Sequence, residues 1–162
     1  MTRTTQIRAA LLLVATLAAP VAQAVVSCTV SASGVNFGIY NPLSAAPLDS
    51  TGSVTVTCTL QSGGATTVNM IAKLSAGSSG SFAARTMVSG VQQLKYNLYW
   101  SNAYAQVWGD GTGGSFYGTA TLALTAANPT QQANGTMYGQ IPAAQDVGAG
   151  SYLDTIVVTV SY

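Results

Sequence analysis

Two cysteines carry the most reactive side chains of this sequence, and three kinds of chemistry compete for them. A cysteine nucleophile needs a neighbouring base, most often histidine, and the chain has no histidine. A structural zinc site needs four ligands, which two cysteines alone do not supply. A disulfide needs only the pair and an oxidising compartment. The sequence therefore favours a bond between Cys28 and Cys58 over a thiol active site or a metal centre.

The residues around each cysteine predict where this bond lies. Successive side chains of a strand point to opposite faces of a sheet. In the runs 26–32 and 54–60, each cysteine shares its face with apolar residues. Both sulfurs should therefore point inward, and we predict a disulfide that joins the first two strands across the core. Closing a loop of about thirty residues stabilises a fold by roughly 3–4 kcal/mol.

Aspartates and glycines supply the other patterns that could indicate a site. The aspartates could include a glycosidase pair, but each lies beside turn residues or in a loop, where aspartate serves the turn itself. They are Asp49, Asp110, Asp146 and Asp154. The glycine-rich segment 109–114 lacks the lysine of a phosphate-binding loop, and no helix is predicted after it. We therefore predict no enzyme, no cofactor, no metal site and no small-molecule substrate.

Aromatic residues are densest between positions 96 and 108. Packing in the core and between neighbouring strands explains such a stretch without any further function. The alternative is an exposed aromatic surface that adheres to a solid or binds carbohydrate. Its candidate residues are Tyr99, Tyr104 and Trp108.

The N-terminal residues have the pattern of an export signal. Arg3 and Arg8 precede an apolar run over 9–19, and small residues at 22–24 form a cleavage pattern. The run is shorter than the ~20 residues that a membrane-spanning helix needs. We predict export by the Sec route to the periplasm, and from there to the cell surface or the medium. The predicted boundaries are 1–24 for the signal peptide and 25–162 for a single mature domain.

Charge is scarce in the predicted mature domain. Lys73, Arg85 and Lys95 stand against the four aspartates, which gives a net charge near −1. Because there is no basic patch, nucleic acid is a poor partner on electrostatic grounds. Solubility must come from serine, threonine, asparagine and glutamine, and such a surface suits a protein that assembles.

Strand patterns recur along the domain and helix patterns do not. Apolar and polar residues alternate in the two cysteine runs and in the further segments 68–75, 94–101, 119–125 and 137–141. Turn-forming residues separate these segments, among them Gly63-Gly64, Gly77 to Gly80 and Asn134-Gly135. Half-buried strands at this spacing predict an all-β fold, an antiparallel immunoglobulin-like β-sandwich.

The segment 155–162 alternates in the same way. Ile156, Val158, Val160 and Tyr162 fall on one face of an extended strand. A strand this apolar must lie within a sheet, because an exposed one would pair with other chains. Either the domain covers this strand itself, or another chain does.

Short motifs, taken in order along the chain, carry a family resemblance. They are SCTVSA at 27–32, VNFGIYNP at 35–42, GSVTVTC at 52–58, LKYNLY at 94–99, VWGDG at 107–111, YGQIP at 138–142 and GSYLDT at 150–155. Together they resemble the spore coat protein U domain family, which includes subunits of archaic chaperone–usher pili. The motifs cover essentially the whole predicted mature chain, so the match is specific although each motif alone is weak.

This resemblance implies an incomplete sandwich whose missing strand is donated, first by a periplasmic chaperone and then by a neighbouring subunit. That mode of binding is β-strand addition. The expected partners are the chaperone, an outer-membrane usher and other pilus subunits. In this interpretation Ile156, Val158, Val160 and Tyr162 border the groove that accepts the strand. The expected function is that of a structural subunit of a surface fibre, a pilus or fimbria.

The predicted N-terminus of the mature chain departs from the pattern of polymerising subunits, which carry an extension that donates the strand. Val25, Val26 and Ser27 precede Cys28 in the predicted mature chain, whereas a donor strand needs about five or six residues. The chain therefore looks able to accept a strand but poorly equipped to donate one. Earlier cleavage, near Ala18 or Ala19, is the alternative that would leave residues 20–24 as a short donor. Two alternatives to a fibre rod subunit stay open: a self-complete secreted coat protein, and a terminal tip adhesin that binds a surface or a carbohydrate.

Overall fold

The computed structural model of the chain describes residues 23–162. The predicted signal peptide lies outside these residues except for Gln23 and Ala24, and its cleavage site stays a prediction. The strands are β1 (Val25–Ser33), β2 (Leu48–Ser62), β3 (Thr66–Leu74), β4 (Arg85–Ser89), β5 (Gln92–Tyr99), β6 (Gly118–Leu124), β7 (Thr130–Ile141) and β8 (Val158–Ser161). A short 3-10 helix, η1 (Gly77–Ser79), lies between β3 and β4.

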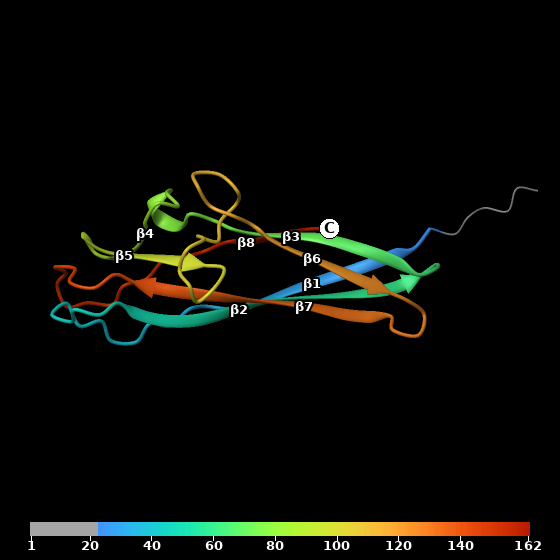
Figure 1. Cartoon of the computed structure of the whole chain (residues 1–162), viewed down its shortest axis with the longest axis horizontal. Coiled ribbons are helices and arrows are strands. Elements are labelled where there is room, and N and C mark those ends of the chain that lie inside the picture. The colour runs from blue at the N-terminus through green and yellow to red at the C-terminus, as the bar shows by residue number, and fades with distance from the viewer. Residues whose placement is uncertain (1–22) are drawn as a thin grey trace, which may run out of the picture.

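The strands form two antiparallel sheets that enclose one core (Figure 1). The larger sheet has the strand order β1-β2-β7-β5-β4, and the smaller sheet has the order β6-β3-β8. β6 lies against β7 and β2 of the larger sheet. Consequently β8, at the opposite margin of the smaller sheet, lies on the side of β1. This arrangement confirms the predicted all-β, antiparallel, immunoglobulin-like sandwich.

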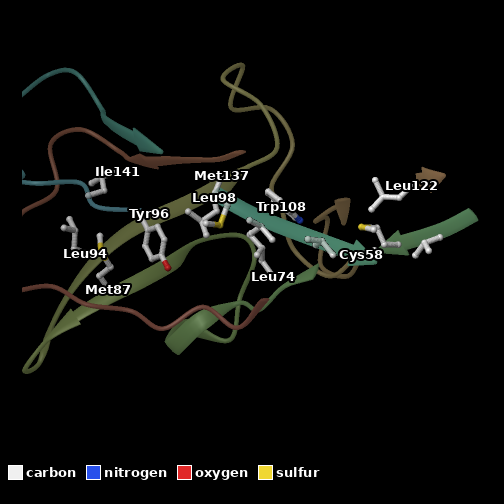
Figure 2. Close-up of a cluster of buried hydrophobic side chains, with 14 of the residues drawn as sticks. Cys58, Leu74, Met87, Leu94, Tyr96, Leu98, Trp108, Leu122, Met137 and Ile141 are labelled. Carbon is white, nitrogen blue, oxygen red and sulfur yellow. The ribbon is translucent and has the colours of Figure 1, made fainter. Parts of the chain in front are cut away.

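The period-two pattern of β2 shows how the sequence builds the core. Val54, Val56 and Cys58 point inward and are 2%, 3% and 0% exposed, respectively. The threonines between them point outward, because neighbouring side chains of a strand lie on opposite faces. Inward side chains of the other strands complete one continuous cluster (Figure 2). The buried members on β5 and β7 are Leu94, Tyr96, Leu98, Met137 and Ile141.

Two elements differ from the sequence-based prediction. The alternation pattern does not predict β4, because its five residues are too few to show a period, and only pairing with β5 defines it. The predicted turn at Asn134-Gly135 is wrong, since both residues lie inside β7 opposite Thr55 and Val54. A Cβ on Gly135 would stand 2.7 Å from the Trp108 ring. The glycine therefore makes room for an indole inside the sandwich instead of turning the chain.

Candidate functional site at the open flank

The strand β8 has a strand partner on one side only among residues 23–162. It pairs antiparallel with β3, with Val158 opposite Leu74. At its start, the Ser75 N–H donates a hydrogen bond to the Val157 carbonyl at 2.9 Å. Hydrogen-bonded positions alternate along an antiparallel strand. Val158 and Val160 therefore direct their backbone N–H and C=O groups away from β3, toward an open edge.

The side chains of the same residues point into the sandwich. Ile156, Val158 and Val160 are half-buried and pack against the core, whereas the intervening Val157 is 59% exposed. The structure thus brings together three of the four residues predicted for this face. The fourth, Tyr162, follows β8 and is 62% exposed.

The outer strand β1 forms the facing margin, and its inward side is equally incomplete. Val30 lies opposite Val56 in the antiparallel register, yet Val30 is 45% exposed while Val56 is 3% exposed. Both side chains point toward the core, so the difference comes from missing cover over β1 and not from direction. We name the margin between the inward faces of β1 and β8 the open flank.

The predicted disulfide is present, but it does not cross the core. Cys28 and Cys58 are direct register partners on β1 and β2, with their Cα atoms 4.1 Å apart. The expectation of a bond across the core was wrong because the first two strands are hydrogen-bonded neighbours in one sheet. The bond therefore holds the outer strand β1 to β2 at the open flank.

The open flank continues into a cavity of about 890 Å³ beyond the ends of the two strands. Its walls are the segment that follows β1, 34–40, and the segment that precedes β8, 147–153. Its floor is made by the core side chains Met87, Leu94 and Ile141, which lie together at one end of the cluster in Figure 2. The hollow is thus bounded by the segment that follows β1 and by the segment upstream of β8, the two strands that border the flank.

Asp154 fixes the segment that leads into β8. One carboxylate oxygen accepts hydrogen bonds from the Ser78 N–H at 2.8 Å and from the Ser78 hydroxyl at 2.6 Å. The other accepts from the Tyr96 hydroxyl at 2.7 Å. Partial burial raises the pKa of the Asp154 carboxyl, but these hydrogen bonds outweigh burial and leave the pKa below its usual value. Burial and the bond to Asp154 raise the pKa of Tyr96.

Arg85 is a second organising residue that the sequence pattern did not reveal. It is 0% exposed, and its guanidinium donates to the carbonyls of Ser75 and Trp108 and to Oδ1 of Asn97, at 2.7 to 3.0 Å. Burial lowers its pKa. One cation therefore ties the end of β3, β5 and the loop after β5 together. The scarcity of basic residues could have drawn attention to Arg85, since it is one of three in the predicted mature domain.

Trp108 does not belong to an exposed aromatic surface, so this part of the prediction was wrong. The residue is 1% exposed, and its indole N–H donates to the Ala72 carbonyl at 3.0 Å. A Cβ on Gly118 would stand 2.5 Å from the Trp100 ring and 3.2 Å from the Trp108 ring, so the bare backbone there leaves room for both indoles. Tyr99 and Tyr104 are half-exposed and lie together, with their rings edge to face at 5.4 Å between centroids.

No group of three or more histidine, cysteine, aspartate or glutamate side chains in the described chain is placed to share a metal ion. Within the same residues, no helix has the length and apolar character to cross a membrane.

Comparison with protein families decides the affiliation of this sandwich. A match to the spore coat protein U domain extends over residues 13–159. The chain belongs to the spore coat protein U domain family. The resemblance inferred from the short motifs is therefore confirmed.

This spore coat protein U domain is similar to a bacterial protein in sequence and to a chain of a solved complex in structure. Protein U of Myxococcus xanthus is 33% identical over 135 residues, which cover 79% of this chain and 71% of that protein. A chain in the crystal structure of the CsuC–CsuE chaperone–tip adhesion subunit pre-assembly complex, from the archaic chaperone–usher Csu pili of Acinetobacter baumannii, is 25% identical with a TM-score of 0.56. That match covers 85% of this chain and 40% of the Csu chain.

Proposed function

We propose that this protein is a subunit of a surface fibre, built by a chaperone–usher pathway, whose sandwich is completed by a strand from another chain. The open flank carries this proposal. There, the backbone groups of Val158 and Val160 face an open edge while their side chains are half-buried over the core. An extended segment laid along β8 would receive backbone hydrogen bonds and would cover the same side chains.

The partner segment follows from the chemistry of the flank. β-Strand addition draws affinity from main-chain hydrogen bonds and specificity from pockets that take alternate side chains. The inward positions on both margins are aliphatic, as Val30 and Ile156 illustrate, so the donated strand should carry apolar residues at every second position. Its remaining residues would face solvent and can be polar.

The order of partners follows the family to which the chain belongs. A periplasmic chaperone would fill the flank first, and a neighbouring subunit would replace it when an outer-membrane usher adds the protein to the fibre. Two observations support a chaperone and further subunits as partners: the family match and the likeness to a chain of a chaperone–subunit complex. The protein would pass through the periplasm to the cell surface and would act by binding, without catalysis.

A position at the tip of the fibre is the second candidate, and exposed loop residues favour it. Ile39 and Leu43, between β1 and β2, are 94% and 92% exposed, and Val91, between β4 and β5, is 95% exposed. Both loops lie at the same end of the elongated molecule in Figure 1. Large apolar side chains gathered on exposed loops are typical of interaction sites. These residues would be the contact points of an adhesin.

Capture by the chaperone tests the first proposal. Val158→Asp would place a charge over the apolar core at the flank, and we expect it to abolish co-purification with the cognate chaperone from the periplasm. Thr159→Asp is the matched control, because Thr159 is exposed on the other face of β8 and should leave capture unchanged. Equal capture of Val158→Asp, or a stable monomeric domain that needs no partner, would instead support the self-complete coat protein.

A further inference from the structure

We propose that the outer face of the larger sheet carries a binding site for a neutral polysaccharide, centred on Tyr99, Tyr104 and Tyr138. This face points away from the core, whereas the open flank is formed by inward side chains. The inference therefore does not depend on strand donation.

Three elements bring the tyrosines together. Tyr99 on β5 and Tyr138 on β7 are register partners, so their side chains lie side by side on one face. Tyr104 comes from the loop that follows β5, and its ring meets that of Tyr99 edge to face at 5.4 Å and 89°. All three residues are half-exposed. They offer aromatic surface on an otherwise hydroxyl-rich face of the sheet.

The loop holds Tyr104 in an unusual backbone conformation. Its φ is 51°, in the left-handed region that residues other than glycine rarely adopt. Two backbone hydrogen bonds fix the turn: the Tyr104 N–H donates to the Ser101 carbonyl at 3.1 Å, and the Trp100 N–H donates to the Gln106 carbonyl at 3.0 Å. Such strain concentrates at functional sites. Here it projects one ring back over the sheet, beside Tyr99.

Polar groups with fixed positions surround the rings. The Gln140 side-chain amide donates to the Asp49 carboxylate at 2.9 Å. Asp49 lies on β2 opposite Gln140, two residues along β7 from Tyr138, so its carboxylate is close to the tyrosines. Partial burial and this neighbouring carboxylate raise the pKa of the Tyr104 hydroxyl. Aromatic side chains with a few convergent polar groups are the usual composition of a small-ligand site. For a sugar, the rings would cover its C–H faces, and the carboxylate and amide would hydrogen-bond its hydroxyls.

The rest of the face argues for a long and neutral ligand. Outward positions of β1, β2 and β7 carry hydroxyl and amide side chains in register, such as Thr55 with Asn134 and Thr57 with Gln132, which are hydrogen-bonded at 2.8 and 3.1 Å. Asp49 is the one charged residue at these positions. Within residues 23–162 this face has a single cation, Lys95 on β5, so it does not suit nucleic acid. Its aliphatic side chains lie at the margins, such as Val88 on β4, so it does not suit an apolar peptide. A polyhydroxyl chain matches both properties.

An array of oligosaccharides tests the site with the exported protein, together with any chain that co-purifies with it. The array should include neutral glucans, mannans, galactans and chitin fragments, beside acidic uronate oligomers. We expect binding to at least one neutral series, weakened about tenfold by Tyr104→Ala and by Tyr138→Ala, as for tyrosines at the centre of an interface. Tyr117→Ala is the matched control, because Tyr117 is 46% exposed but lies just before β6 of the other sheet.

Other outcomes would overturn the proposal. These outcomes are binding to no neutral glycan, binding to uronates alone, or binding of a neutral glycan by Tyr104→Ala and Tyr138→Ala as tightly as by the wild type. Asp49→Asn, which keeps the shape of an exposed side chain, should weaken binding several-fold and covers the case in which an alanine variant fails to fold. Capture by the chaperone separates this site from the open flank, because Tyr104→Ala should be captured like the wild type whether or not glycans bind.

Discussion

The two flanks of this sandwich are built from strands with the same alternating pattern, but they differ in how completely their apolar side chains are covered. At one flank, where β6 lies against β7, the loop after β5 returns Trp108 into the gap between the sheets, and its indole is 1% exposed. At the open flank, Val30 on β1 is 45% exposed although it points toward the same core. The described chain closes one flank with its own loop and leaves aliphatic side chains half-covered at the other.

This difference indicates where a partner can act. A covered flank contributes its stability to the isolated domain, because its apolar surface is already removed from water. An uncovered flank contributes its full share of the free energy of unfolding only when another strand binds and covers its apolar side chains. Substitutions at the two flanks should therefore differ in how much they destabilise the free domain and in whether a partner changes that amount.

The largest effect is expected at the closed flank. Trp108→Ala should lower the free energy of unfolding by about 3–5 kcal/mol, because it leaves a cavity between the sheets and removes the hydrogen bond to Ala72. Urea unfolding of the exported protein measures this. Trp100→Ala is the matched control, since Trp100 is 41% exposed and should cost much less. Equal losses would show that the closed flank is not sealed by the indole.

The second-largest loss of stability is expected on removal of the disulfide, which lies at the margin of the open flank. Replacing Cys28 and Cys58 together with serine should lower the free energy of unfolding by about 2–5 kcal/mol and reduce the yield of exported protein. Non-reducing mass spectrometry should first find the two cysteines in one cross-linked peptide pair. Two free thiols, or a bridge between chains, would contradict the register of β1 and β2.

A matched pair of valines sharpens the comparison further. Val56 and Val30 are register partners, but they are 3% and 45% exposed, respectively. In the free domain, Val56→Ala should cost about 2 kcal/mol and Val30→Ala less than about 1 kcal/mol, because the lost burial differs. Adding the chaperone should raise the cost of Val30→Ala and leave that of Val56→Ala unchanged. If the chaperone altered neither value, strand donation at this flank would be wrong.

The smallest effect concerns pH and the segment before β8. The folded pKa of Asp154 lies below its usual value, so its contribution is present above the unfolded pKa of about 3.9 and is lost as pH falls toward the folded pKa. Wild type should therefore lose stability below about pH 4 more steeply than Asp154→Asn. Asp146→Asn, at an exposed loop position, is the control and should follow the wild-type curve. If the stability of all three proteins fell with pH along parallel curves, Asp154 would not be the source of the acid-induced loss of stability.

Much of the fold and part of the site follow from local sequence. The runs around Cys28 and Cys58 predict β1 and the end of β2, and alternation in 155–162 predicts the inward face of Ile156, Val158 and Val160. These strand predictions succeed because any strand with one buried face must show a period of two, and that period is a property of neighbouring residues.

What the sequence alone determined is therefore the fold class, the pair of cysteines and the faces of the strands. The tertiary structure decided which strands lie at the margins, and that depends on pairing between distant segments. It placed the disulfide within one sheet, buried Trp108 against Gly118 and Gly135, and brought Asp49 beside Tyr104 and Tyr138. The contacts of Trp108 and of Asp49 join residues 10 or more positions apart in the sequence. The alternation of neighbouring residues within one strand cannot predict such contacts.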